Sequence, residues 1–141
     1  MSLTADIITY LTTQGHIDEI NWKSSVGIEQ MPARVEAAPQ VIAVQDAAVG
    51  GDDTHGNDNR HQGIRVLVRG KQHAYETTRT KFLAVFDALQ DKAEEITADP
   101  GTTETILHIH SDNEGPLVSF GGNRGDRIHM TTLFRMMIAK Q

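Results

Sequence analysis

The feature of this sequence that most restricts its fold is the regular alternation of side chains between residues 127 and 138. Every second position from Ile128 to Ile138 is apolar except Thr132. Successive side chains of a β-strand point to opposite faces of a sheet, so this period predicts one long strand with one buried face. The same period from residue 63 to 69 predicts a second strand. Its buried face should hold Ile64, Val66 and Val68, and its other face Arg65, Leu67 and Arg69.

Two segments have the spacing of three and four residues that is typical of amphipathic helices. The longer runs from 73 to 90, where apolar residues recur from Tyr75 to Leu89 and charged residues occupy the other face. Its large apolar side chains are expected to pack in the core. The shorter helix is expected from Ala5 to Gln14, with Gly15 at its end.

The rest of the chain contains shorter strands and polar connections. We predict further strands at Val41–Gln45, Thr103–Ser111 and Pro116–Phe120, and a strand or an ordered arm within residues 16–40. In the Thr103–Ser111 strand, one face should hold Leu107 and Ile109, and the other Ile106, His108 and His110. Residues 48–62 are predicted to form a long polar loop that makes contacts, and residues 91–102 a polar linker.

These elements predict a single two-layer α+β domain that spans residues 1–141. Short connections between neighbouring strands favour a mainly antiparallel or mixed sheet of about four main strands. The long helix should pack on one face of this sheet, and a short helix should precede the sheet. The length suits one core, since a domain of about 150 residues buries roughly two-thirds of its unfolded surface.

The composition argues against several classes of function. The chain has no cysteine, so neither a disulfide framework nor thiolate metal ligation is available. Its formal net charge of −6 disfavours general binding to DNA or anionic membrane, because a backbone binder needs clustered Lys and Arg. The amino terminus does not read as a signal peptide, and no apolar stretch approaches the roughly 20 residues that span a bilayer. We therefore expect a soluble, unexported protein.

No motif in the sequence predicts catalysis. Asp53-Thr54-His55-Gly56 resembles the Asp-x-His turn of metallophosphoesterases, but the chain lacks both the Asn-His pair and the successive βα units on which those enzymes carry their later histidines. Neither a Gly-x-Ser-x-Gly elbow nor a Gly-x-x-x-x-Gly-Lys phosphate loop is present. We therefore predict a protein that is not an enzyme and that uses no cofactor.

Two groups of residues leave a metal site open as an alternative. The first provides oxygen and imidazole ligands from Asp52, Asp53, His55, Asp58 and His61. We favour a solvated acidic loop there, because Asp, Asn and Gly populate turns for backbone reasons alone. The second is His108 with His110, which share a strand face but lack an identifiable third ligand. Half-buried histidines are the favoured interpretation, so no metal is predicted.

The segment from Val41 to Leu89 has a recognisable order of elements. A short strand opens into a loop that begins with a Gly pair, and a second strand ends in Val68-Arg69-Gly70. The helix that follows has Tyr75 in its first turn and ends in Asp87-Ala88-Leu89. This order, with the later strands and their Gly turn, resembles the tail terminator, or minor capsid, family of long-tailed bacteriophages. The loop departs from the family, because Asp, His and Asn replace the prolines often found after its Gly pair.

The resemblance implies a structural virion protein that acts in the tail or neck after assembly in the host cytoplasm. Several copies would form a homo-oligomeric ring, hexameric by this resemblance. The ring would cap the tail tube, end polymerisation of the tail tube protein, and offer a joining surface to the head-tail connector. DNA would only pass through its lumen, as cargo. Another neck or head-completion protein of similar fold, a small metal-dependent hydrolase and a cellular ligand-binding module are the alternatives.

Charged residues suggest how the copies would meet. Four arginines are expected on exposed strand faces, where they need anionic partners, and the acidic loop of a neighbouring copy can supply these. The predicted interface therefore comprises Asp52, Asp53, His55, Asp58, Arg60, Arg65, Arg69, Arg127 and Arg135. Such a contact joins unlike surfaces head-to-tail, as a ring of identical subunits requires.

Overall fold

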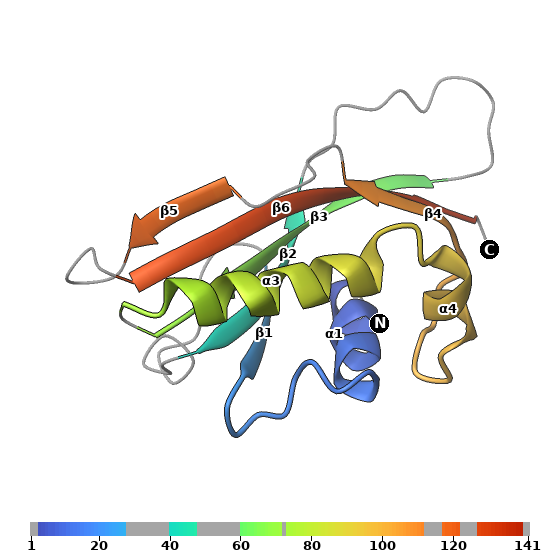
Figure 1. Cartoon of the computed structure of the whole chain (residues 1–141). Coiled ribbons are helices and arrows are strands. Elements are labelled where there is room, and N and C mark those ends of the chain that lie inside the picture. Colours follow the sequence, from blue (N-terminus) through green and yellow to red (C-terminus); the bar gives the residue numbers. More distant parts are fainter. Residues whose placement is uncertain are drawn as a thin grey trace.

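The computed structural model describes residues 3–27, 40–47, 60–71, 73–111, 117–121 and 127–139, which form a sheet with helices on one face (Figure 1). The helices are α1 (Leu3–Thr13), α3 (Tyr75–Leu89) and α4 (Ala93–Ala98). The strands are β1 (Lys23–Gly27), β2 (Val41–Ala47), β3 (Arg60–Arg69), β4 (Ile106–Ser111), β5 (Leu117–Gly121) and β6 (Arg127–Ile138). The predicted two-layer α+β class is confirmed. None of the described helices has the length and apolar character needed to cross a membrane.

The alternating segment at residues 127–138 is β6, the strand around which the sheet is built. Along one side it pairs antiparallel with all of β3, from Arg60 to Arg69. Along the other side it pairs antiparallel with β4 near its C-terminal end and with β5 near its N-terminal end. β2 continues the sheet antiparallel to β3, and β1 lies parallel to β2 at the far edge. Because β3 begins at Arg60, residues 60–62 belong to this strand and not to the predicted loop.

The apolar series of the two long strands face the helices and form the core. α1 lies against β1 and β2, α3 against β3 and β6, and α4 against β4 (Figure 1). Phe86 of α3 packs on Phe134 of β6, with 5.5 Å between the ring centroids. Thr132, the polar member of the β6 series, is buried with its hydroxyl 2.7 Å from that of Ser111. This pairing lets a polar residue occupy a core position.

The region around α4 and β4 differs from the prediction in two ways. Residues 93–98 form a helix within the segment expected to be a linker. Its only buried residue is Ile96, too little for a recognisable apolar period. In β4 the register shifts between Ile106 and His108, so that Ile106 and Ile109 are both buried and Leu107 is 47% exposed. The predicted faces are therefore wrong for Ile106 and Leu107, because one extra residue at a β-bulge interrupts the alternation, whereas His108 and His110 share one face and Ile109 lies on the other, as predicted.

The side chains of Gln90, just after α3, and Thr97, in α4, close the outer edge of β4. The Gln90 side-chain oxygen accepts a hydrogen bond from the Ser111 N–H at 2.8 Å, and its amide nitrogen donates to the Ser111 carbonyl at 3.4 Å. The Thr97 hydroxyl accepts from the Ile106 N–H at 2.9 Å and donates to the Ile106 carbonyl at 3.1 Å. These groups occupy backbone positions that another strand would use, so β4 is protected against edge-to-edge pairing.

We expect Gln90→Ala to lower the free energy of unfolding by about 1–3 kcal/mol, because it removes partners from two backbone groups of the buried Ser111. The variant should also aggregate more readily, since it opens a strand edge. Denaturant unfolding and light scattering measure the two effects. Gln62→Ala is a matched control: its exposed 3.1 Å bond to Asp46 should contribute no more than about 0.5 kcal/mol. Equal losses in the two variants would contradict the edge-closing role.

Candidate functional site

Three of the predicted interface arginines are exposed in the structure. Arg60 forms an exposed ion pair with Glu104, with 3.4 Å between the guanidinium nitrogen and the carboxylate oxygen. Arg65 and Arg135 lie on the face of the sheet turned away from the helices, which we call the second face. Arg135 pairs in register with Gly63, so it is a diagonal neighbour of Arg65 on the adjacent strand. Of the predicted interface residues, the structure therefore brings Arg65 and Arg135 close together, but not Arg60, which pairs in register with Ile138.

The predicted exposure of Arg69 is wrong. Only 1% of the surface of this residue is exposed. It lies on the second face in register with Val41, which is also buried. Ala43, on the same face of β2, is buried as well, and Leu67 of β3 packs beside it. The second face is therefore covered over β2 and the end of β3. Alternation distinguishes the two faces of a strand but cannot reveal whether the polar one meets solvent.

The other predicted interface residues cannot be placed in this way. Asp52, Asp53, His55 and Asp58 lie outside the described residues. The side chain of Arg127 also lies outside the described part, although Arg127 is the first residue of β6. Their role at an interface stays a prediction.

The predicted histidine pair lies on the second face, at the edge formed by β4. The rings of His108 and His110 stack with 5.9 Å between their centroids, and His110 Nδ1 is 3.9 Å from an Asp91 carboxylate oxygen. Met137 pairs in register with both His61 and His108. These two histidines are therefore about 10 Å apart across the sheet, too far to bind one ion. Among the described residues, no three His, Cys, Asp or Glu side chains are grouped closely enough to hold a metal ion.

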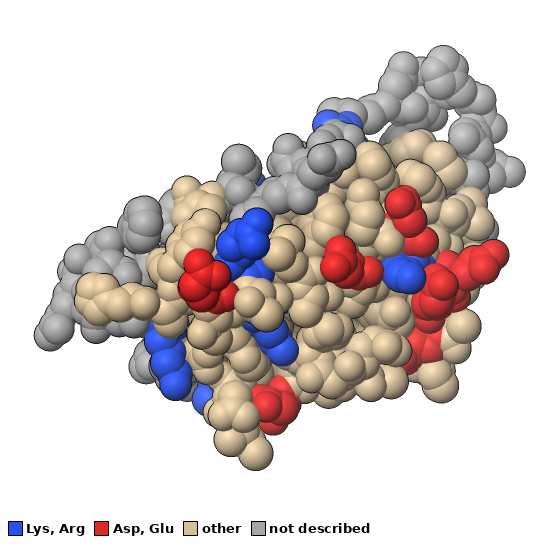
Figure 2. All heavy atoms as spheres, in the orientation of Figure 1, with Lys and Arg blue, Asp and Glu red and all other residues tan. Residues whose placement is uncertain are grey.

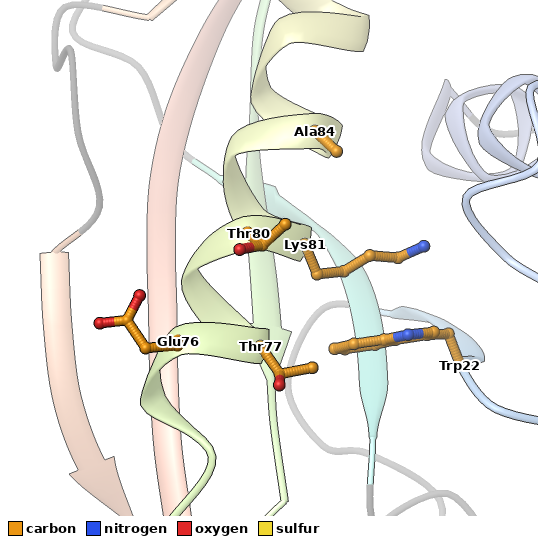
Figure 3. A pocket seen from close by; sticks show the side chains of 6 residues that line it. All are labelled: Trp22, Glu76, Thr77, Thr80, Lys81 and Ala84. Atoms are coloured by element: carbon orange, nitrogen blue, oxygen red, sulfur yellow. The ribbon is translucent and has the colours of Figure 1, made fainter.

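A groove that the sequence analysis did not predict lies between α3 and the residues just before β1 (Figure 3). Its volume is about 410 Å³, and it is lined by Trp22, Glu76, Thr77, Thr80, Lys81 and Ala84. Trp22 is the only tryptophan of the chain and is 9% exposed. The Lys81 side chain extends over its ring, with Nζ 5.3 Å from the ring centroid (Figure 3). Trp22 and α3 are far apart in the sequence, so neither segment alone indicates this groove.

A turn centred on Asp18 holds Trp22 in the wall of the groove. One Asp18 carboxylate oxygen accepts hydrogen bonds from the backbone N–H groups of Asn21, at 2.8 Å, and Trp22, at 2.9 Å. Glu19, within the turn, has a φ of 59°, in the left-handed region that few residues other than glycine adopt. The Trp22 hydrogen bond, followed by those of Asn21, lowers the pKa of Asp18 from 3.8 to about 2. The hydrogen bonds of the turn therefore favour the ionised form of the carboxylate.

Lys81 supplies the positive charge of the groove. Partial burial lowers the pKa of its ammonium group, while the charge of Asp18 acts in the opposite direction. Burial, and secondly the charge of Lys81, lower the pKa of the neighbouring His16. Within the described part of the chain, no carboxylate forms an ion pair with Lys81. The groove thus combines an aromatic wall, threonine hydroxyls and a partly desolvated cation, a combination that suits a ligand with apolar and anionic groups.

Comparisons with known proteins identify the fold but no sequence family. No family model matches the chain, and no curated protein matches it significantly. Among solved structures, a chain in the virion of a native gene transfer agent particle matches with a TM-score of 0.66 and 13% identity, covering 97% of this chain and 94% of that chain. A crystal structure from Akkermansia muciniphila matches with a TM-score of only 0.30 and 10% identity, covering 72% of this chain and 43% of that chain. The protein therefore shares the fold of the gene transfer agent chain.

Acid should weaken the Asp18 turn, but only at a pH below the pKa of an ordinary aspartate. Because folding lowers the pKa of Asp18 from 3.8 to about 2, its contribution to stability is complete above pH 3.8 and is lost as the pH falls toward 2. The fluorescence of Trp22 should follow this loss.

Two variants provide the controls for that titration. Asp18→Asn keeps an oxygen acceptor but cannot titrate, so it should retain the Trp22 signal at neutral pH and lose this acid transition. Asp18→Ala removes the acceptor and should change the signal at neutral pH. An unchanged acid transition in Asp18→Asn would show that another group controls the turn.

Proposed function

We propose that this protein is a structural, non-enzymatic subunit of a virion. The observation that carries the proposal is the fold match, at a TM-score of 0.66, to a chain in the virion of a gene transfer agent particle. The match covers 97% of this chain and 94% of that one, so the two have nearly the same extent. A likeness of fold does not itself establish function. It supports the proposal because the sequence resemblance leads independently to a virion protein.

Within the virion, we propose the role of a tail terminator. Several copies form a ring, hexameric by the family resemblance, that caps the tail tube and blocks addition of further tube protein. The exposed end of this ring is the joining surface for the head-tail connector, and DNA passes through the lumen. The segment that carries this finer proposal runs from Val68-Arg69-Gly70 to Leu89, which has the family's order of strand, turn and helix.

The second face of the sheet offers charged groups for a contact between copies. Arg65 and Arg135 are exposed neighbours there, whereas the buried Arg69 no longer belongs to the proposed interface. Asp52, Asp53 and Asp58 of the adjacent copy remain the proposed partners of these arginines. An exposed ion pair contributes only about 0–1 kcal/mol, so the ring requires several such contacts and should weaken as salt is added.

The proposal is tested by measuring the mass of the purified protein and its effect on growing tail tubes. The protein should sediment as a multiple of its 15.5 kDa subunit, and tubes assembled with it should stop at a defined length. The variant Arg65→Glu with Arg135→Glu should fold, because both side chains are exposed, but should form rings poorly and let tubes grow too long.

The charge-retaining variant Arg65→Lys with Arg135→Lys is the matched control and should behave like the native chain. Tubes of normal length built with a monomeric Glu variant would show that this face does not mediate termination. A native protein that stays monomeric and leaves tube length unchanged would overturn the terminator role itself.

A further inference from the structure

Charge is unevenly distributed along α3. Figure 2 shows Asp and Glu side chains gathered around the α4 end of the molecule, with Lys and Arg mostly nearer the opposite end. Between the middle of α3 and the end of α4, the exposed acidic residues are Asp87, Asp91, Glu94 and Glu95. The last turn of α3 contains no basic residue, although the C-terminal end of a helix dipole attracts cations. This end of the subunit therefore carries negative charge that α3 itself does not compensate.

The acidic end has a small apolar surface of its own. Four residues on α4 and just after it are exposed: Glu94, Glu95, Ala98 and Pro100. We call this set the acidic tip. Its negative potential extends into the protein: burial raises the pKa of Tyr10, and the charges of Glu95 and Asp99 raise it further. A surface of this kind fits a partner that has an apolar wall and a cation.

The groove beside Trp22 has these properties and lies at the other end of the same helix. It is lined by residues from Glu76 to Ala84, in the N-terminal part of α3, whereas the acidic tip follows the C-terminal end. The last lining residue, Ala84, lies five residues, or about 8 Å along the helix axis, before the end of α3, and the acidic tip follows beyond residues 90–92. The groove has room for several side chains in its volume of about 410 Å³. Its cation, Lys81, forms no ion pair with any described carboxylate.

We propose that the acidic tip of one copy docks into the Trp22 groove of the next copy. This inference rests on the proposed ring and names a contact in its helical layer. In this contact, the carboxylates of the tip face Lys81 of the next copy. Ala98 and Pro100 of the tip pack against Trp22 of that copy. The contact joins unlike surfaces at opposite ends of the subunit, so it repeats head-to-tail and closes into a ring where the rotation between copies allows.

Two single charge reversals test the two sides of this contact. Glu94→Lys alters the tip, and Lys81→Glu alters the groove. Each should weaken self-association by about three- to tenfold per contact, and added salt should reduce the difference between native and variant chains. Asp46→Lys, an exposed acidic residue on β2, is the control with the same charge change as Glu94→Lys and should assemble like the native protein. Circular dichroism verifies that each variant is folded, and Lys81→Gln provides a milder groove variant.

Mixing the variants distinguishes a head-to-tail contact from a symmetric one. In the mixture, the native tip of Lys81→Glu meets the native groove of Glu94→Lys, and the reversed tip meets the reversed groove with opposite charges. Neither variant alone should form rings, whereas a head-to-tail contact lets the equimolar mixture form rings in which the two alternate, and a symmetric contact would stop at a heterodimer. A chain with both reversals should recover ring formation, because opposite charges face each other again. Sedimentation velocity measures these masses. Trp22 fluorescence should change when the native protein assembles and should not change in Glu94→Lys at the same concentration.

The results of these experiments distinguish a failure of the tip–groove contact from a failure of the proposed ring. Rings of native stability in both Glu94→Lys and Lys81→Glu would overturn the contact and leave the ring intact. A mixture of the two variants that forms no mixed ring would also overturn it. If Trp22 responds only when tail tube protein is added, the groove binds that protein and not a second copy. A native chain that remains monomeric and does not affect tube length would overturn both the ring and this contact.

Discussion

The pairing of β6 with three other strands is the constraint on which the rest of the structure depends. β6 pairs with β3 along one side and with β4 and β5 along the other, so its register determines where each of them lies. A slip of one residue would turn Met130, Phe134 and the other core residues toward the second face. α3 packs on β3 and β6 through this apolar layer, and its outward side forms one wall of the groove. The strand pairing therefore positions a surface that β6 itself does not touch.

Local periodicity predicts much of this fold from the sequence, because long strands and helices repeat their pattern several times. β6, β3, α3 and α1 were predicted with errors of a few residues at their ends. α4 was missed because six residues with one buried side chain contain less than one apolar repeat. The bulge in β4 was missed because it is a feature of the pairing with β6, which is distant in the sequence. The candidate site was predicted less well, since the burial of Arg69 and the approach of Trp22 to Lys81 both depend on tertiary packing.

The subunit combines a net charge of −6 with local surfaces of both signs. Net repulsion between identical acidic subunits disfavours nonspecific association, while complementary patches favour a defined orientation. Because each patch is small and partly hydrated, a single contact is weak. In the proposed ring, all of the contacts together would stabilise the closed arrangement, so assembly would depend steeply on concentration. Such behaviour would suit the proposed tail terminator, which must remain dispersed until it meets the end of the tube.

The closed edge of β4 also has a consequence for biosynthesis. The groups that cover this edge come from residues 90–97, including the Asp91 N–H that donates to the Ile109 carbonyl at 3.2 Å. A ribosome makes these residues before it makes residues 106–111, so the cover is already synthesised when the vulnerable strand emerges. β4 can then pair with this segment while β6, its partner on the other side, is still inside the ribosome. The order of synthesis shortens the time in which an unpaired strand of one nascent chain can join that of another.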